Sequence, residues 1–364
     1  MSRPGRVSRT TTELSRAEVL TISVLTWLEY LSSYLPSGTS IGIDPALLAV
    51  SDYKLLSDDL SRRGLLLKPL VHNLVDEVWQ DVSSEEAQSR PPPSRREIFV
   101  QPLRFAGKSI AEKVAEVRGE VQKLCEQHSA DGLRLAGFVA TMLDEVAWLV
   151  NLRGSDVPYN PVFFAFALVP LPEKGPVTLY AQGDQLTPDA KEQLQDAGVI
   201  IKPYQSFYED LHLIGNSLSE GEKYLIGKRA SLAVASALGG MSKVHVDRSP
   251  VIDLKSIKNE VELDGFRHSH LLDGAALANY FAWLESQLAA GNPVTEFEGS
   301  EKLHACRAAM QGFKGDSFTT ISSTGPNAAI IHYSPPPTGS DVIDKEKVYL
   351  CVSGAQFVDG TTDV

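Results

Sequence analysis

The feature that most constrains the fold is a repeated alternation of short apolar runs with amphipathic segments before residue 250. Near the start, residues 40–43 and 65–69 are predicted strands on either side of a helix that ends at about residue 63. Asp44 suits the N-cap of that helix and Pro45 suits its first turn. Strand, helix and strand at this spacing predict a parallel α/β unit.

The same alternation resumes after a polar, proline-rich linker at residues 83–96, which marks the first domain boundary. In this second set, strands are predicted at residues 132–140, 161–169, 177–181, 199–203, 223–226 and 244–246, and helices at residues 109–128, 141–151, 188–197, 206–213 and 218–222. The repeated order of helix and strand is compatible with two related α/β domains.

A third region opens at about residue 251 with a long predicted helix, residues 258–288, in which Asn259 and Glu262 form a plausible capping pair. After this helix we expect a second helix at residues 294–309, strands at residues 316–321 and 328–332, and a final hairpin within residues 348–364 that turns at Asp359-Gly360.

Composition limits the function classes. The 364 residues have a net charge of −12 and no basic block, which argues against a nucleic-acid partner. No apolar run is long enough to predict a membrane span. The three cysteines are far apart, without zinc spacing or a disulfide framework, so a reducing, cytoplasmic compartment is expected. The arginine-containing start can be a weak targeting peptide or a disordered tail, and we favour the tail.

Two residues near the end could take part in chemistry. Asp363 ends a Gly-Thr-Thr-Asp run, where a carboxylate can cap a turn or face a metal, and by itself the turn is the better interpretation. His332 follows an apolar run, where a histidine that hydrogen-bonds the backbone is commoner than an active-site residue. The residues alone leave both alternatives open.

Residues 353–364, SGAQFVDGTTDV, resemble the first metal-ligand segment of eukaryotic Xaa-Pro aminopeptidases, the aminopeptidase P family. Residues 35–45 are similar to the first non-catalytic domain of that family, and residues 143–164 are similar to its second. Residues 320–333 are similar to the start of its catalytic domain. The resemblance covers nearly the whole chain after about residue 20.

The resemblance implies an α/β fold with two creatinase-like α/β domains, followed by the N-terminal part of a pita-bread α+β metallopeptidase domain. The expected boundaries are 19–90 for a partial first domain, 97–250 for the second and 251–364 for the incomplete catalytic part. Residues 1–18 are expected to be a disordered or atypical N-terminal segment.

Family members hold two metal ions with two aspartates, one histidine and two glutamates, and the two aspartates lie eleven residues apart. Because 363 − 352 = 11, the resemblance makes Asp363 the second aspartate and puts Val352 at the first position. An isopropyl group has no lone pair for a metal ion. His332 matches the active-site histidine beside the metals. The histidine and glutamate ligands would lie beyond residue 364.

Other polar residues do not complete this set. His268, His270 and His304 lie on predicted helices and are expected to be exposed or packed rather than ligands. A cluster of Trp148, Arg153 and Asp156 is interpreted as core packing with an internal salt bridge. The alternative is a wall of the substrate cleft or a subunit contact.

The family reaction is removal of the N-terminal residue from peptides with proline second, assisted by two Mn²⁺ ions. We expect this chain to be a truncated or wrongly assembled form of such an enzyme, with peptidase activity low or absent. The alternative is a non-catalytic paralogue that acts as a binding or dimerisation partner. The resemblance allows a homodimer and gives no reason to expect nucleic acid or membrane as a partner.

Overall fold

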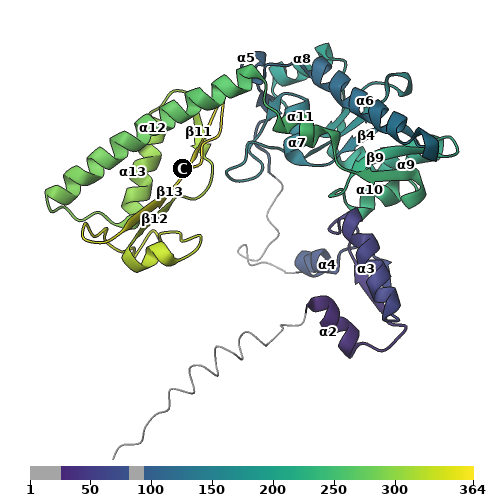
Figure 1. Ribbon diagram of the computed structural model, residues 1–364, viewed down its shortest axis with the longest axis horizontal. Coiled ribbons are helices and arrows are strands. Elements are labelled where there is room, and N and C mark those ends of the chain that lie inside the picture. The colour runs from purple at the N-terminus through teal and green to yellow at the C-terminus, as the bar shows by residue number, and fades with distance from the viewer. Residues whose placement is uncertain (1–25, 82–93) are drawn as a thin grey trace, which may run out of the picture. The chain divides into compact units, whose positions relative to one another are not determined.

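The computed structural model describes residues 26–81 and 94–364. The chain divides into two compact units, residues 1–89 and 90–364, which are described separately (Figure 1). Residues 1–18, for which a disordered or atypical segment is expected, lie outside the described residues. Most of the proline-rich linker at residues 83–96 also lies outside them.

The first unit is a small α/β arrangement. Its elements, in chain order, are α2 (Trp27–Tyr34), β1 (Ser40–Ile43), α3 (Val50–Arg62), β2 (Leu66–Pro69) and α4 (Leu74–Asp81). β1 and β2 pair in parallel, which confirms the strand–helix–strand prediction. The predicted start of the intervening helix is wrong: Asp44 Oδ1 accepts a hydrogen bond from Ala46 N at 2.8 Å and forms a turn, so α3 begins later, at Val50.

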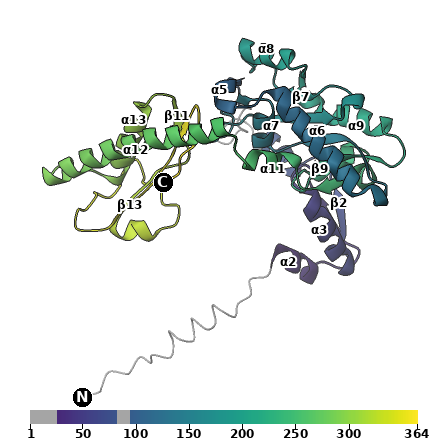
Figure 2. The same ribbon diagram turned by 45° about the horizontal axis from the view of Figure 1, so that its top comes forward.

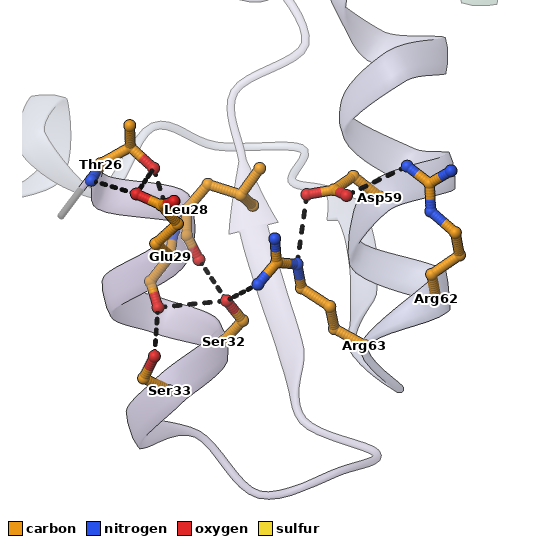
Figure 3. A network of polar contacts seen from close by, with 8 residues as sticks. All are labelled: Thr26, Leu28, Glu29, Ser32, Ser33, Asp59, Arg62 and Arg63. Atoms are coloured by element: carbon orange, nitrogen blue, oxygen red, sulfur yellow. Dashed lines mark hydrogen bonds and ion pairs between the residues drawn. The ribbon is translucent and has the colours of Figure 1, made fainter.

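α2 is fixed to the end of α3 by an exposed polar network (Figure 3). Arg63, the C-cap of α3, donates to Ser32 Oγ at 2.9 Å and pairs with Asp59 at 3.3 Å. Leu60 and Leu65 form the buried centre beneath this network, and Leu28 of α2 packs against them. Because exposed ion pairs contribute little, the leucine contacts provide most of the stabilisation.

The second unit begins with an α/β part built on a six-stranded sheet. Its strands lie in the order β10 (Val244–Asp247), β9 (Glu222–Gly227), β4 (Arg134–Ala140), β6 (Ala165–Pro170), β7 (Thr178–Ala181) and β8 (Ile200–Pro203). β10, β9 and β4 run parallel, β4–β6 and β6–β7 are antiparallel, and β7–β8 are parallel.

The helices of this part cover both faces of the sheet, as Figures 1 and 2 show. The helices are α5 (Leu103–Ala106), α6 (Ile110–Gln127), α7 (Leu143–Leu149), α8 (Pro188–Asp196), α9 (Phe207–Ser217), α10 (Leu232–Ala237) and α11 (Pro250–Ser256), with a two-stranded pair, β3 (Phe99–Val100) and β5 (Leu152–Arg153), beside them.

Side chains alternate between the two faces of a strand. Ala165 and Ala167 of β6 therefore share a core with Val114 of α6, while Phe166 between them stacks on Phe207 of α9 at 3.9 Å between ring centroids. The predicted α/β class is confirmed in this part. One predicted helix is wrong, since residues 218–222 form no helix and α9 ends at Ser217.

The remainder of the second unit is an α+β segment. It contains the long helix α12 (Glu260–Ala289), α13 (Glu296–Ala308), and the strands β11 (Phe313–Asp316), β12 (Ile321–Thr324), β13 (Tyr349–Val352) and β14 (Ala355–Phe357). α12 and α13 lie side by side in both ribbon views. The predicted capping pair of α12 is confirmed: Asn259 Oδ1 accepts from Glu262 N, and Glu262 accepts from Asn259 N, both at 3.0 Å.

Two strand predictions in this segment are wrong. The predicted strand at residues 316–321 is not continuous. Its first residue ends β11, its last residue begins β12, and residues 317–320 between them are irregular. The predicted strand at residues 328–332 is instead a 3₁₀ turn, η6 (Gly325–Ala329), followed by a loop. β12 pairs with β13 and β11 with β14, both antiparallel.

Candidate metal centre

The end of the described chain folds back as a tight antiparallel hairpin, which we call the C-terminal hairpin, residues 353–364. Ser353 and Val364 exchange two backbone hydrogen bonds of 2.9 and 3.0 Å, and Thr362 N donates to Ala355 O at 2.9 Å. Phe357 N donates to Gly360 O at 2.8 Å, so the two-residue loop is Val358–Asp359. The hairpin prediction is confirmed, but its turn lies one residue earlier than expected.

This register places Val352 and Asp363 on the same face of the hairpin. Side chains opposite each other, and those two residues apart on the partner strand, share one face of an antiparallel pair. Since Ser353 is opposite Val364, Gly354 is opposite Asp363, and Val352 is the diagonal neighbour of Asp363. Val352 is half-buried and Asp363 is exposed. Two aspartates at these positions could therefore act on one ion.

The hairpin strands approach so closely that a side chain at residue 354 is excluded. A Cβ atom added at Gly354 would lie 2.1 Å from Thr362 O and 2.3 Å from Ser317 Oγ. Ser317 contacts both strands, because its N–H donates to Gly354 O at 3.0 Å and its hydroxyl donates to Thr362 O at 2.9 Å. Glycine at residue 354 thus permits the geometry that positions Asp363.

We expect Gly354→Ala to loosen the hairpin, because the added methyl group must push Thr362 away from residue 354. Overpacking of this kind costs about 1–3 kcal/mol. Amide hydrogen exchange at Thr362 and Val364 should become about tenfold faster or more.

Gly183→Ala is the matched control, since a Cβ at residue 183 would meet no atom within 4 Å. Exchange rates at Thr362 that are equal in the two variants would contradict the close-approach argument.

The loop that contains His332 is held by a buried carboxylate. Glu296 of α13 is fully buried and accepts from Thr324 N at 2.6 Å, Asn327 Nδ2 at 3.2 Å and the Tyr333 hydroxyl at 2.6 Å. Burial, helped by the hydrogen bond to Glu296, raises the pKa of Tyr333 to about 12, so the hydroxyl remains a donor.

His332 itself is exposed and adopts a positive φ of 56°. Its ring makes no hydrogen bond or ion pair with the residues that the structure describes, and no such contact joins it to Asp363. The hydrogen bonds to Glu296 therefore fix the backbone around His332. The side chains of His332 and Asp363 do not contact each other.

The residues present do not fit a metal ion. Within residues 26–81 and 94–364, no group of three or more His, Cys, Asp or Glu side chains is arranged to hold one. The Asp363 carboxylate has no polar partner among them, and the Val352 side chain next to it has no donor atom. A single carboxylate cannot replace the several oxygen or nitrogen ligands that such ions require.

The three histidines on predicted helices, His268, His270 and His304, contact oxygen atoms of the protein itself. His268 Nδ1 is 2.7 Å from Asp359 Oδ2 of the hairpin loop, and His304 Nδ1 is 2.8 Å from Asp316 Oδ2. His270 Nδ1 is 2.8 Å from Phe266 O within α12. The His268 contact anchors the hairpin loop to α12.

The α/β part of the second unit also contacts the hairpin. Tyr159 O accepts from Gln356 Nε2 at 2.9 Å and its hydroxyl accepts from Thr319 Oγ1 at 3.0 Å, while Gln101 Nε2 donates to Val358 O at 2.7 Å. These contacts come from the α/β part and touch the same hairpin that contains Asp363.

Trp148, Arg153 and Asp156 do not form one cluster. Arg153 donates to the carbonyl oxygens of Ala147 and Leu152, and Asp156 accepts from Phe164 N at 2.9 Å. No ion pair joins Arg153 to Asp156 in the part of the chain that the structure describes. Trp148 is buried, as the core-packing interpretation predicts. The predicted salt bridge between Arg153 and Asp156 is not formed.

Besides Glu296 and Lys113, sequence reasoning missed two buried ionisable features. One is the ion pair of Arg307 with Asp273 beneath the hairpin, and the other is Glu145 in the α/β part. Asp273 lies on the buried face of α12 with Ala276, Tyr280 and Leu284, but α12 has no clear apolar stripe in the sequence that marks this face. For Glu145 the one signal was its position just after a strand end.

Two family profiles match the chain. The creatinase/prolidase N-terminal domain matches residues 89–262, and metallopeptidase family M24 matches residues 264–364. Curated relatives include a probable Xaa-Pro aminopeptidase P of Paracoccidioides lutzii, 44% identical over 94% of this chain and 54% of its own length. One of Laccaria bicolor is 46% identical over 94% of this chain and 50% of its own. The chain spans about half the length of the curated relatives it matches.

Among solved structures, the fold is similar to an X-prolyl aminopeptidase from Caenorhabditis elegans, described as a cytosolic enzyme with a di-nuclear active site. The TM-score is 0.80 at 30% identity, over 93% of this chain and 52% of that one. Among the described helices, none has the length and apolar character needed to span a bilayer.

Proposed function

Because the chain belongs to the M24 metallopeptidase family, with a creatinase-type N-terminal domain and Xaa-Pro aminopeptidase P proteins as relatives, we propose that it represents the non-catalytic part and the first catalytic segment of an Xaa-Pro aminopeptidase. The complete protein would remove the N-terminal residue from cytoplasmic peptides with proline second. We further propose the domain division 19–90, 97–250 and 251–364.

We propose that these 364 residues alone have little or no peptidase activity. The observation that carries this proposal is Val352, which lies on the same hairpin face as Asp363, where the family motif has an aspartate. A dinuclear centre in such enzymes polarises the peptide carbonyl and supplies hydroxide. This chain presents one of the expected carboxylates, Asp363, and His332 as the histidine expected to hold substrate. Mn²⁺ is the proposed metal of the complete family site.

A non-catalytic binding role is the second candidate. It is favoured by exposed apolar residues on the α+β segment, notably Ile331 at 85% and Val348 at 72% exposure. Exposed apolar residues mark an interaction surface where they form a contiguous patch. A second copy of this chain is one partner that could cover them, and neither nucleic acid nor membrane is proposed.

The purified 364-residue chain with Mn²⁺ should hydrolyse a peptide with proline second no faster than the same peptide without protein, because no ligand set assembles. The rate of release of the N-terminal residue is the measurement. The C. elegans X-prolyl aminopeptidase is the positive control, and the same peptide with alanine second tests specificity.

A Mn²⁺-dependent rate that EDTA abolishes would overturn the inactive interpretation. A rate that survives EDTA would indicate a contaminating peptidase, which the Asp363→Asn variant checks, because a contaminant is unaffected by that change.

A further inference from the structure

A cavity lies in the α/β part of the second unit, lined by none of the hairpin residues. It has a volume of about 220 Å³. Residues that follow three parallel strands line it: Thr141 after β4, Gly227 and Arg229 at the end of β9, and Ser249 after β10. The carboxyl ends of neighbouring parallel strands are where open α/β sheets bind ligands.

A buried carboxylate without a full set of partners lines this cavity. Glu145 of α7 is 2% exposed, and its Oε2 accepts from Ser249 Oγ at 2.9 Å. Its Oε1 is buried and has no hydrogen-bond partner among the described residues. A buried acceptor that is left unpaired costs about 1–3 kcal/mol, so a ligand that donates to Oε1 would remove this penalty.

Burial, more than any other cause, raises the pKa of Glu145 to about 7. The hydrogen bond from Ser249 and the charge of Lys255 lower it, while Asp144 raises it further. A bound ammonium group would favour the ionised carboxylate, because opposite charges within a few ångströms stabilise each other.

The rim of the cavity is cationic. Lys228 pairs with Asp247 at 3.6 Å, and Arg248 pairs with Asp253 at 2.8 Å. Arg229 is exposed and has no polar side-chain partner among the described residues. Its planar guanidinium is suited to a carboxylate, which it can bind through two parallel hydrogen bonds.

The walls between the carboxylate and the rim are largely apolar. A cavity of about 150 Å³ with apolar walls is large enough for benzene, so this slightly larger one can take a branched aliphatic chain. The apolar lining residues are Phe138, Val139, Met142, Ala230 and Ile252.

We propose that this cavity binds a free α-amino acid with an apolar side chain, whose ammonium group donates to Glu145 and whose carboxylate pairs with Arg229. A buried acceptor, a free cation and apolar walls together match the three parts of such a molecule. The proposal is independent of peptidase activity and of the metal ligands.

Isothermal titration of the unchanged 364-residue chain at pH 8 tests the proposal with L-leucine and two matched analogues. 4-Methylpentanoate lacks only the ammonium group, and 3-methylbutylamine lacks only the carboxylate. L-leucine should bind about tenfold more tightly than either, because each analogue loses one charge-assisted hydrogen bond. Equal affinity for leucine and either analogue overturns the proposal, and so does no binding of leucine.

Variants assign the two contacts. Glu145→Gln should remove the preference for leucine over 4-methylpentanoate, and Arg229→Gln should remove the preference over 3-methylbutylamine. Arg95→Gln, at an exposed arginine outside the cavity lining, should change neither preference. A preference retained in Glu145→Gln counts against the site. If that variant does not fold, the analogue series on the unchanged chain still decides.

Two further measurements distinguish binding in this cavity from binding of leucine elsewhere on the chain. Leucine should bind about tenfold more weakly at pH 6 than at pH 8, because Glu145, with a pKa of about 7, becomes protonated over that range. The charges of Asp144 and Lys255 act on the pKa of Glu145. The other charged residues that line the cavity with it are Lys228, Arg229 and Arg248. Asp363→Asn should leave the affinity for leucine unchanged. A loss of leucine binding in this variant would mean that leucine binds at the hairpin.

Discussion

Val352→Asp should raise the manganese-dependent hydrolysis of a peptide with proline second by about 100-fold or more, when the chain is given a complete catalytic domain. The assay protein is a chimera of these 364 residues and the portion of the C. elegans X-prolyl aminopeptidase that follows the matched half. Loss of an outer-shell partner alone costs metal sites 10–100-fold, so a missing ligand should cost at least the upper value.

The geometry of the hairpin is the reason to expect recovery from one substitution. The backbone bonds between Ser353 and Val364 are already formed at 2.9 and 3.0 Å, so the partner strand presents Asp363 on the face of residue 352 without rearrangement. Val352 is half-buried, and aspartate is close to valine in size. The new carboxylate therefore faces partial solvent and does not enter a closed core.

Two controls make this result specific. Leu350→Asp places the same carboxylate two residues earlier on the same strand face, where residue 350 lies at 36% exposure, and it should not raise the rate. Asp363→Asn added to Val352→Asp should abolish the gain. A chimera that is already fully active with Val352 would show that this position is not needed for the metals.

Local signals predicted the α12 terminus well. The Asn259–Glu262 capping pair lies within one turn, so its geometry depends on residues that are adjacent in the sequence. The parallel pairing of β1 with β2 was predictable for the same reason, because the strand and helix lengths allow few other connections.

The loop at residues 325–333 was not predictable, because its conformation depends on a distant residue. The apolar run at residues 328–331 is typical of a strand. Glu296, 31 residues before Asn327, instead binds Thr324, Asn327 and Tyr333, and the chain turns around that carboxylate. Ile330 and Ile331 consequently lie exposed, at 52% and 85%.

The hairpin turn was displaced by one residue for a related reason. Asp-Gly is the commoner turn pair, and by local propensity Asp359-Gly360 should occupy the loop. The carboxylate of Asp359 lies 2.7 Å from His268 of α12, and a Cβ added at Gly265 would meet Asp359 O at 2.3 Å. Packing of this loop on α12 therefore selects the register, which local sequence does not reveal.

The ion pair of Arg307 with Asp273 beneath the hairpin was also not predicted, because its two residues lie on different helices, 34 residues apart. Arg307 of α13 is fully buried and Asp273 of α12 is 1% exposed. Arg307 Nε and Nη2 donate to the two oxygens of Asp273 at 2.6 and 3.1 Å, and Nη1 donates to Gly354 O at 3.4 Å. An Arg on one predicted helix and an Asp on another are ordinarily expected on the solvent side, so their burial is apparent only in the assembled fold.

Arg307→Met should destabilise the α+β segment by about 3–5 kcal/mol, because it leaves the Asp273 carboxylate buried without a partner. The double variant Arg307→Met with Asp273→Leu should recover most of that loss, since no charge then remains in the core. The measurement is amide hydrogen exchange within α12 and α13, which reports on this segment separately from the rest of the chain.

The exposed pair of Arg267 with Asp264, whose side chains are 67% and 74% accessible, provides the control. Arg267→Met should change exchange in α12 little, because surface pairs contribute at most about 1 kcal/mol. A double variant as unstable as Arg307→Met would mean that the arginine acts mainly through Gly354 O. In that case amide exchange at Thr362 would rise equally in Arg307→Met and in the double variant. The main role of Arg307 would then be to position the hairpin that contains Asp363.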